Sequence, residues 1–465
     1  MINIKHKKIV FLGYGAVAKC VWNYFDKYFE VNRKRVALVD KSKDAFTGSN
    51  LKGIKKIVMN VESTNFETLI HSLGLKKHDI IIDLTTSSNT YYFIKMCLIH
   101  EFHYINTSIE DETDAMLGSS IDCQQHTVAS IASQFPKSKC TILTEFGQNP
   151  GLIQHYILNA LSKMANVKIT PDNMKKVIRD FKVGTILMSE IDNMVTTEPI
   201  ETAIIYNTWS VAGYVCEAKD NTELVCGKTN SFVKPSIPED KKSKFMMKIY
   251  DQIRGESNYD VIFLNENGFK TTLNSICPVL NDKGDIEFTN YRGKLIHHGE
   301  IFEMARYFGK NAPFMSYVYK TNPYIDQSIE SLKSEYKVGD HHLLLYVNQE
   351  HNFKVFGGEN MTGHDSIGCT IFCGEEKIDR IFWCGSILSS EQIEKKEYTP
   401  TIVQVAAGVL SGLSFIVENQ QLGWIEPIDI DTKYILEKST PLLGKFLFME
   451  IPVEKFNGPI SYQEN

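Results

Sequence analysis

A glycine-rich turn near the N-terminus most constrains what this chain can fold into. Residues 8–18 read KIVFLGYGAVA, a short apolar run that leads into the pattern G-x-G-x-x-A. An acid, Asp40, closes the next apolar run, residues 36–39. A dinucleotide-binding βαβ unit consists of a strand, a glycine turn, a helix and a second strand that ends in an acid. The pattern predicts such a unit, and the alternative is a turn of the same shape that binds nothing.

Each residue of the turn has a physical role in this prediction. Gly13 permits the tight turn, and Gly15 lets a pyrophosphate approach the backbone at the positive end of the following helix. Ala18 is small enough for close packing of the helix on the strand. The predicted cofactor contacts of the turn are Gly13, Gly15, Ala16 and Val17.

The acid at the end of the second strand indicates which cofactor is preferred. Asp40 can accept hydrogen bonds from both ribose hydroxyls and repels a 2′-phosphate, which favours NAD over NADP. Lys41 and Lys43 follow closely and weaken this preference.

Length and charge limit the class of protein. At 465 residues the chain is too long for one core, so two domains are expected. Its 43% apolar and 23% charged residues are typical of a globular protein, and its net charge of −6 argues against a nucleic-acid partner.

Several features predict a cytoplasmic protein without a membrane partner. The N-terminus runs directly into the first predicted strand, so we expect no signal peptide. Polar residues and glycines interrupt the longest apolar stretch, residues 402–417, which indicates a buried helix rather than a membrane span. The ten cysteines contain no C-x-x-C pair, which favours reduced thiols and no metal site.

Strand-like and helical segments alternate through the first 150 residues. The alternation predicts an α/β fold with a Rossmann, doubly wound parallel sheet over residues 1–151. Longer mixed segments then predict an α+β substrate and dimerisation domain over 152–399, with a hairpin turn at 281–285. A C-terminal segment, 400–465, opens with an apolar helix expected to return to the first domain between about 400 and 430. The predicted Rossmann strands are residues 8–13, 36–40, 57–59, 79–84, 103–107 and 140–144.

Polar residues follow these strands at their carboxyl ends, where ligands of open α/β sheets bind. Asn149, in the turn FGQNPG, offers a donor and an acceptor suited to a nicotinamide amide, although a structural turn is the alternative. The further predicted cofactor contacts are Thr85, Ser87, Asn106, Thr107, Asn149 and Pro150.

A few acids, a tryptophan and a histidine are candidates for amine chemistry. Glu110, Glu190 and Glu217 could hold ammonium groups and move protons, although each alone is more commonly a surface acid. Trp209 could attract an alkylammonium to its indole face, or could be a core residue. His298, in the segment HHGE, could shuttle protons, and a buried histidine is equally consistent with its sequence.

Several of these segments together resemble the bacterial-type homospermidine synthases of the saccharopine dehydrogenase-like group. The segments NTWS and HGE are the ones specific to this family, whereas the glycine turn alone fits many dehydrogenases. The matching segments are residues 13–18, 149–151, 189–190, 207–211, 298–300 and 401–408.

The resemblance implies a homodimeric transferase with NAD that is reduced and reoxidised within one turnover. One putrescine is oxidised to an imine, ammonia leaves, a second amine adds, and the new imine is reduced to homospermidine. Spermidine is a possible second substrate, with release of a diamine.

The resemblance also assigns roles to residues. Trp209 would hold a cationic intermediate, Glu190 and Glu217 would bind or relay protons from the amines, and Glu110 would anchor a distal ammonium. Near the nicotinamide, the site would be lined by Asn149, His298 and Glu300.

One turn departs from the family, and two other functions stay open. The family places a carboxylate in the turn after the fourth strand, whereas here Thr85–Ser88 carries none, which leaves the preferred amine open. A saccharopine- or carboxyspermidine-type NAD(P) reductase would need arginines for its carboxylated substrates, and arginines are scarce beyond residue 151. The other alternative is a non-catalytic NAD-binding sensor.

Overall fold

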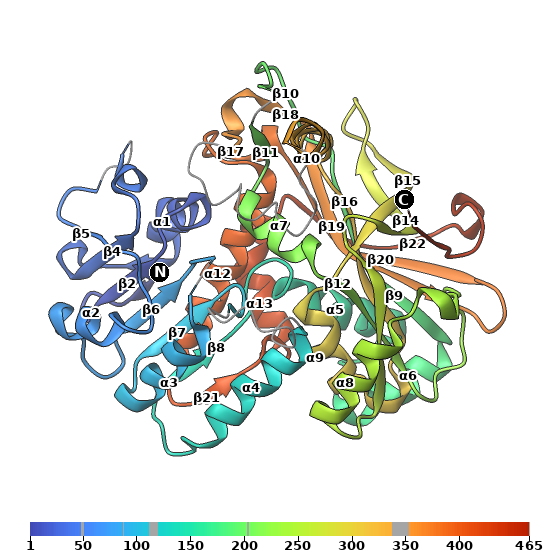
Figure 1. The fold of residues 1–465 in the computed structure, drawn as a ribbon, viewed down its shortest axis with the longest axis horizontal. Coiled ribbons are helices and arrows are strands. Elements are labelled where there is room, and N and C mark those ends of the chain that lie inside the picture. The colour runs from blue at the N-terminus through green and yellow to red at the C-terminus, as the bar shows by residue number, and fades with distance from the viewer. Residues whose placement is uncertain (48–50, 87, 111–119, 202–203, 337–352, 465) are drawn as a thin grey trace. The chain divides into compact units, whose positions relative to one another are not determined.

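The computed structural model describes residues 1–47, 51–86, 88–110, 120–201, 204–336 and 353–464 (Figure 1). It contains two compact units. The first comprises Met1–Leu152 and Ile402–Leu442, and the second comprises Ile153–Thr401 and Leu443–Asn465. Each unit is therefore built from two separate stretches of the chain, and residues after Leu442 belong to the second unit rather than to a separate segment.

The first unit is built on a seven-stranded sheet in which all neighbouring strands are parallel. The order β21-β8-β7-β6-β2-β4-β5 is that of two βαβαβ halves with one strand added beside β8. The predicted α/β class with a doubly wound sheet is confirmed. The strands are β2 (Ile9–Leu12), β4 (Val36–Asp40), β5 (Lys55–Val58), β6 (Ile80–Asp83), β7 (His103–Asn106), β8 (Thr141–Leu143) and β21 (Gly423–Ile425).

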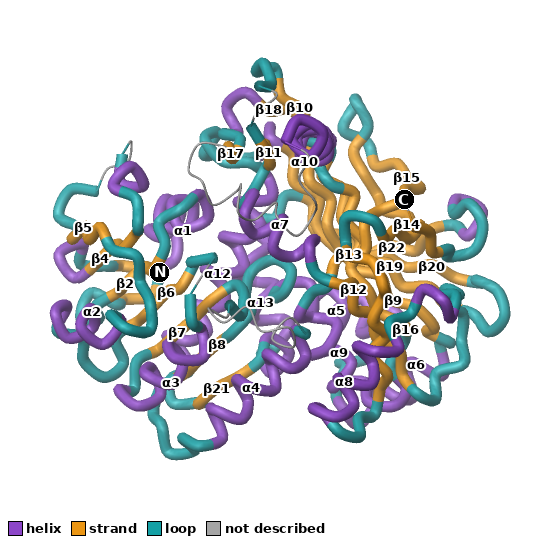
Figure 2. The backbone as a smooth tube through the Cα atoms, viewed as in Figure 1, coloured by secondary structure: helices purple, strands orange, loops and turns teal. Residues whose placement is uncertain are grey.

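Helices lie beside the strands of this sheet (Figure 2). Buried apolar residues of the strands and helices form one cluster. In α1 the buried residues include Ala18, Cys20 and Phe25. A parallel pair of two-residue strands, β1 (Ile2–Asn3) and β3 (Phe29–Glu30), had no counterpart in the sequence prediction. The helices are α1 (Ala16–Tyr28), α2 (Phe66–Leu73), α3 (Thr90–His100), α4 (Ile121–Ser133), α12 (Pro400–Glu418) and α13 (Thr432–Ser439).

Helix α12 is the segment expected to return to the first domain. Among the described residues it alone is long and apolar enough to cross a membrane, but 89% of its apolar window is buried within the structure, as in a core helix. A Cβ on Gly408 would lie only 2.0 Å from the carbonyl oxygen of Gly147, so the helix backbone lies directly against the loop after β8.

The second unit is built on a ten-stranded sheet with the main order β22-β20-β19-β9-β16-β15-β14-β23, while β12 pairs with β13 and β16. Its described strand pairs are antiparallel except β9 with β16. The predicted hairpin turn at 281–285 joins β14 to β15. The strands are β9 (Val183–Asp192), β12 (Asn221–Gly227), β13 (Tyr259–Asn267), β14 (Thr271–Leu280), β15 (Ile286–Ile296), β16 (Phe314–Lys320), β19 (His364–Cys373), β20 (Arg380–Ser389), β22 (Lys445–Ile451) and β23 (Tyr462–Glu464).

Every residue of β9 and β19 is buried, so these strands lie at the centre of the second unit. Two short ribbons accompany the large sheet: β10 (Val195–Thr196) with β18 (Met361–Thr362), and β11 (Ile205–Asn207) with β17 (Phe353–Val355). The helices are α5 (Leu152–Ala165), α6 (Pro171–Asp180), α7 (Val211–Lys219), α8 (Lys244–Arg254), α9 (Gly299–Phe308) and α10 (Pro323–Tyr336).

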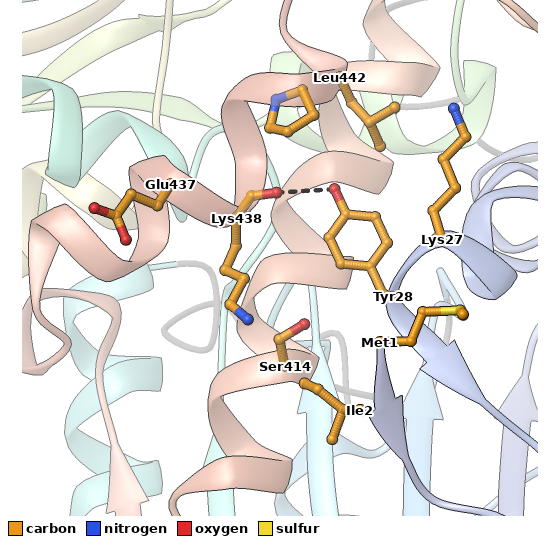
Figure 3. A pocket seen from close by; sticks show the side chains of 9 residues that line it. Met1, Ile2, Lys27, Tyr28, Ser414, Glu437, Lys438 and Leu442 are labelled. Atoms are coloured by element: carbon orange, nitrogen blue, oxygen red, sulfur yellow. Dashed lines mark hydrogen bonds between the residues drawn. The ribbon is translucent and has the colours of Figure 1, made fainter.

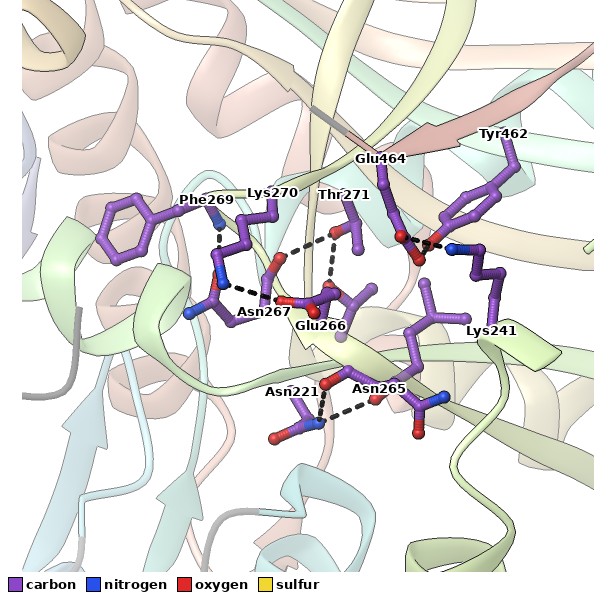
Figure 4. Close-up of polar contacts among 12 residues, drawn as sticks. Asn221, Lys241, Asn265, Glu266, Asn267, Phe269, Lys270, Thr271, Tyr462 and Glu464 are labelled. Atoms are coloured by element: carbon purple, nitrogen blue, oxygen red, sulfur yellow. Dashed lines mark hydrogen bonds and ion pairs between the residues drawn. The ribbon is translucent and has the colours of Figure 1, made fainter. Parts of the chain in front are cut away.

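Polar contacts fix the C-terminal strand at the edge of this sheet (Figure 4). Strand β23 pairs with β14, and Lys241 Nζ contacts Glu464 Oε2 at 2.6 Å. Behind this edge, the Thr222 and Thr271 hydroxyls lie 2.8 Å apart, and Thr222 donates to the carbonyl oxygen of Leu295. Strand β23 is therefore part of the second unit's sheet.

Candidate active site

The glycine turn of the first unit has the geometry that a bound pyrophosphate requires. Gly13 has φ +75°, and a Cβ there would lie 2.7 Å from the carbonyl oxygen of Leu84, so only glycine fits without a shift. At Gly15 a Cβ would meet nothing within 4 Å. Helix α1 starts at Ala16, next to Val17, with no side-chain cap and no acid in its first turn. Its backbone N–H groups are therefore suited to an anion.

The carboxylate of Asp40 is held at the end of β4 by backbone donors. Its Oδ2 accepts from the N–H of Tyr14 at 2.7 Å, and its Oδ1 accepts from the N–H of Ser42 at 2.8 Å. These bonds keep a negative charge beside the glycine turn, as a contact to ribose hydroxyls requires.

The turn after β6 is organised around a buried acid. Asp83 accepts from the Thr85 hydroxyl at 2.6 Å, from the Thr85 N–H at 3.1 Å and from the Tyr104 hydroxyl at 2.7 Å. Burial raises the pKa of Asp83 despite these bonds. Asp83 thus positions the predicted contact Thr85, while Ser87 lies outside the described residues.

The strand ends of β7 and β8 carry the remaining cofactor candidates. Asn106 accepts from the N–H of Glu145 at 2.9 Å and donates to the carbonyl oxygen of Ser108 at 2.6 Å. Thr107 lies beside Gly147, where a Cβ would be 3.4 Å from the threonine methyl. Both residues lie at the carboxyl edge of the sheet, where the sequence prediction expected them.

The loop that holds Asn149 is closed by its own backbone. The Asn149–Pro150 peptide bond is cis, and the N–H of Gly147 donates to the carbonyl oxygen of Pro150 at 2.8 Å. Gly151 has φ +126°, and a Cβ there would lie 2.4 Å from the Gly147 carbonyl oxygen. The backbone of the loop thus contacts itself between Gly147 and Pro150, and Asn149 is half-buried.

In the second unit, one histidine lies between two glutamates. His298 is 5% exposed and directly precedes α9, with its Nε2 3.2 Å from Glu217 Oε2 and its Nδ1 3.3 Å from Glu300 Oε2. Only the contact to Glu217 has hydrogen-bond geometry. Burial lowers the pKa of His298, but the two carboxylates outweigh it and hold that pKa well above its usual range. The two carboxylates therefore favour the charged form of His298.

Tyr317 connects this histidine to Glu190. The rings of Tyr317 and His298 lie 4.3 Å apart, and the Tyr317 hydroxyl donates a short hydrogen bond to Glu190 Oε2. Glu190 is 2% exposed. Burial and the Glu190 carboxylate raise the pKa of Tyr317 well above its usual range, so the phenol keeps its proton. Protonated histidine, phenol and carboxylate form one continuous group.

The ring of Trp209 is fixed beside this group. Its indole N–H donates to the hydroxyl of Tyr319 at 3.2 Å, and Tyr319 stacks on Tyr317 with ring centroids 5.6 Å apart. A Cβ on Gly213 would lie 2.9 Å from the indole, so the missing side chain of α7 makes room for the ring. The edge of Tyr214 faces Trp209 at 6.5 Å.

The structure brings together five of the seven predicted catalytic residues in the second unit: Glu190, Trp209, Glu217, His298 and Glu300. Asn149 and Glu110 belong to the first unit. There, Glu110 accepts from the Ser108 hydroxyl at 2.8 Å, and its N–H donates to Thr90.

Sequence reasoning missed four side chains of the second-unit cluster. Tyr317 and Tyr319 alternate along β16, and Asp192 follows Glu190 by two residues along β9. Asp365 is the cross-strand partner of Asp192. The i, i+2 spacing of the tyrosines and of the acids was the available signal, because such residues share one face of a strand.

A separate pocket of about 230 Å³ lies in the first unit (Figure 3). It contains none of the predicted site residues, and its one marked polar contact is the Tyr28 hydroxyl donating to the carbonyl oxygen of Lys438 at 2.8 Å. Its lining is Met1, Ile2, Lys27, Tyr28, Ser414, Glu437, Lys438, Pro441 and Leu442.

We expect the contribution of His298 to stability to decrease as the pH rises. Because its folded-state pKa is raised, this contribution is full below the ordinary value of about 6.5 and is lost as the pH passes through the folded-state pKa. Urea unfolding of the wild type and of His298→Gln, from about pH 6 to about pH 9, measures this. The difference in unfolding free energy between them should shrink with pH, and a constant difference contradicts the prediction.

Comparison with known proteins shows what this chain is similar to. Residues 9–141 match the model of the saccharopine dehydrogenase NADP binding domain. The chain is 22% identical over 464 residues to a homospermidine synthase of Mesorhizobium japonicum, covering 94% of this chain and 88% of that protein. A homospermidine synthase of Blastochloris viridis is 21% identical, with coverage of 94% and 89%.

A solved structure shares the fold over nearly the whole chain. The homospermidine synthase of Legionella pneumophila, solved in complex with NAD, superposes with a TM-score of 0.79 at 22% identity and covers 97% of this chain and 92% of that one. In sequence and in fold, this chain thus resembles the bacterial homospermidine synthases along almost its entire length.

Proposed function

We propose that this protein is an NAD-dependent homospermidine synthase, a transferase that joins two putrescines into homospermidine and releases ammonia. The proposal includes spermidine as a second possible donor. The first unit would hold NAD at the glycine turn, Asp40 and the following strand ends, and the second unit would hold the amines.

The observation that carries this proposal is the continuous group formed by Glu300, His298, Tyr317 and Glu190, with Trp209 beside it. Buried carboxylates attract ammonium groups, and a desolvated indole face stabilises an alkylammonium or iminium cation. The same arrangement provides a carboxylate that can accept a proton and a protonated histidine that can donate one.

The residues of the second unit have distinct tasks in such a reaction. The glycine turn, Asp40 and the following strand ends would hold NAD, which would supply the acceptor for a hydride from the carbon next to the reacting nitrogen and the donor that returns it. For the hydride to leave, the ammonium must first lose a proton, and Glu190 would accept it. The iminium carbon then adds a second amine. The original nitrogen gains a proton while the added nitrogen loses one, and the bond from the carbon to the original nitrogen breaks, which releases ammonia and leaves the new imine.

Two groups support the later steps. His298, held in its charged form by Glu217 and Glu300, can donate the proton that makes ammonia a good leaving group. Trp209 stabilises the positive charge that is present on both imines. The family resemblance also implies that Glu110 and Asn149 belong to the site, that the protein is a homodimer and that it is cytoplasmic. We include these points in the proposal.

Mass spectrometry of a reaction containing the purified protein, NAD⁺ and putrescine tests the proposal. Homospermidine and ammonia without net NADH are expected, because the hydride is taken and returned within one turnover. Net NADH without a coupled polyamine would indicate a simple amine dehydrogenase instead. Absence of turnover would direct the search to carboxylated substrates of the saccharopine type, and then to a non-catalytic NAD sensor.

Replacing Trp209 by alanine should reduce turnover while NAD binding is retained. A cation–π contact of up to about 2 kcal/mol at a desolvated site corresponds to a loss of about 30-fold. Trp209→Phe keeps an aromatic face and serves as the matched variant, with a smaller expected loss. Steady-state rates and NAD titration measure the two effects, and unchanged turnover of Trp209→Ala would remove the indole from the mechanism.

A further inference from the structure

An ion pair lies next to the aromatic residues beside Trp209. Lys294 belongs to β15, and its direct partner in β16 is Tyr319, which accepts the indole N–H of Trp209. The Nζ of Lys294 donates to the hydroxyl of Tyr214 at 3.0 Å and also to a carboxylate oxygen of Asp326. The side chain of Lys294 is only 15% exposed. The steps of the proposed reaction assign no task to this pair.

Both partners of the ion pair are held in place. Asp326 lies in the first turn of α10, and its second oxygen accepts from the Thr321 hydroxyl at 2.7 Å. The Nζ of Lys294 lies 5.7 Å from the centroid of the Tyr214 ring and 5.6 Å from that of Phe269, within the range of cation–π contacts. Burial lowers the pKa of Lys294, but Tyr214 and Asp326 outweigh burial and raise that pKa above its ordinary value. The charged ammonium is therefore favoured, and it is held by contacts from α7 and α10.

Tyr214 connects the ion pair to the indole. Its side chain is fully buried, and its ring faces Trp209 edge-on, with centroids 6.5 Å apart and an interplanar angle of 84°. It also faces Tyr319, the acceptor of the indole N–H, at 6.3 Å. Without the Lys294 ammonium, the buried Tyr214 hydroxyl loses a charged donor, which favours rearrangement of the ring. A shift of this ring displaces the indole, because the two rings pack against each other.

We propose that Lys294 and Asp326 are positioning residues that hold Tyr214 and thereby keep the indole face of Trp209 aligned with the cationic imine. They act without touching substrate or cofactor. Misalignment of a group that stabilises a developing charge lowers the rate of the chemical step more than it weakens binding of the starting amine. The inference deepens the proposed function and rests on it, because it takes Trp209 to stabilise the imine.

Steady-state kinetics of homospermidine formation test this role. Lys294→Met keeps an unbranched side chain of similar length and removes the ammonium, so kcat should fall about tenfold while KM for putrescine stays within about twofold of the wild type. Lys294→Arg keeps a positive charge with several N–H donors and should retain more of kcat. Lys283→Met removes an exposed lysine in the turn between β14 and β15, and this matched control should behave as the wild type does.

A double-mutant cycle shows whether Lys294 acts through Trp209. In the Trp209→Ala background, adding Lys294→Met should lower kcat by less than about twofold, because the aligned indole is already absent. A merely structural role would lower kcat by the same factor in both backgrounds. Thermal unfolding followed by circular dichroism establishes that each variant is folded. Asp326→Asn, at a side chain that is 40% exposed, is the second variant if Lys294→Met does not fold, and its loss of kcat should likewise require Trp209.

The position of the indole can also be followed without turnover. Subtracting the emission of the matching Trp209→Phe protein isolates the fluorescence of Trp209 among the four tryptophans. Acrylamide should quench this fluorescence more strongly in Lys294→Met than in Lys283→Met, because a displaced indole is more accessible to the quencher.

The inference and the proposed function can fail separately. An unchanged kcat in Lys294→Met, an equally large loss in the Trp209→Ala background, or unchanged quenching overturns the positioning role even if homospermidine is formed. Stronger quenching in Lys294→Met, without formation of homospermidine by the wild type, supports the positioning of the indole by the ion pair and overturns the proposed reaction.

Discussion

Glu190→Gln is expected to lower the rate of homospermidine formation by at least about 100-fold, the range typical for loss of a positioned general base. The amide oxygen of the introduced glutamine could still accept from the Tyr317 hydroxyl, so the local geometry should be kept while the proton acceptor is lost. Quantitative mass spectrometry of the product measures the rate, and NAD titration should give an unchanged dissociation constant because Glu190 lies in the second unit.

Two variants separate this effect from a general loss of charge. Glu287→Gln removes an exposed carboxylate of β15 and should leave the rate unchanged. Tyr317→Phe keeps the Glu190 carboxylate but removes its hydroxyl partner, so an intermediate loss is expected. A Glu190→Gln protein with a rate within about threefold of the wild type would exclude Glu190 as the base.

The first unit could be predicted from the sequence because its signals are local. The apolar runs of β2 and β6 are short, buried and bounded by turn residues, and helical segments separate them. Each predicted strand of this unit has an observed counterpart, although β5 begins at Lys55, two residues before the expected start. The pair β1 and β3 could not be predicted, because two-residue strands have no periodicity to detect.

For the second unit, the sequence predicted the α+β class but not the order of the strands. Strands β9 and β19 are buried on both faces, so they lack the alternation that identifies a half-buried strand. Their pairing joins residues far apart in the sequence, as Asp192 with Asp365 shows. The residues of the NTWS and HGE segments were found from the sequence, whereas Tyr317, Tyr319 and Asp365 join the site through strand register, which a single sequence does not specify.

The turn after β6 illustrates a difference between a family pattern and local chemistry. Residues Thr85–Ser88 carry no carboxylate, and Asp83 stands directly before this turn. In the structure, Asp83 is fully occupied in holding Thr85 and Tyr104. Its carboxylate therefore serves the turn itself.

Gly13→Ala is expected to weaken NAD binding by at least about 100-fold and to lower the free energy of unfolding by about 1–3 kcal/mol. The added Cβ would be forced into a left-handed conformation at φ +75° and would lie 2.7 Å from the Leu84 carbonyl oxygen and 3.0 Å from the Thr85 nitrogen. These are backbone atoms at the end of β6, so relief requires a shift of the strand end that the proposed cofactor site includes. NAD titration and urea unfolding measure the two effects.

Alanine variants of two other glycines distinguish the effects of steric clash, backbone strain and lost cofactor contact in Gly13→Ala. Gly15→Ala adds a Cβ that meets no protein atom within 4 Å, so stability should stay within about 0.5 kcal/mol of the wild type. Its NAD affinity should still fall by about tenfold or more, because the methyl group occupies the approach of the pyrophosphate. Gly255→Ala, at φ +69° with no protein atom nearby, reports the cost of the left-handed conformation alone and should not change NAD binding. If Gly15→Ala binds NAD as tightly as the wild type, the pyrophosphate does not approach this turn, and the cofactor role of the glycine pattern is refuted.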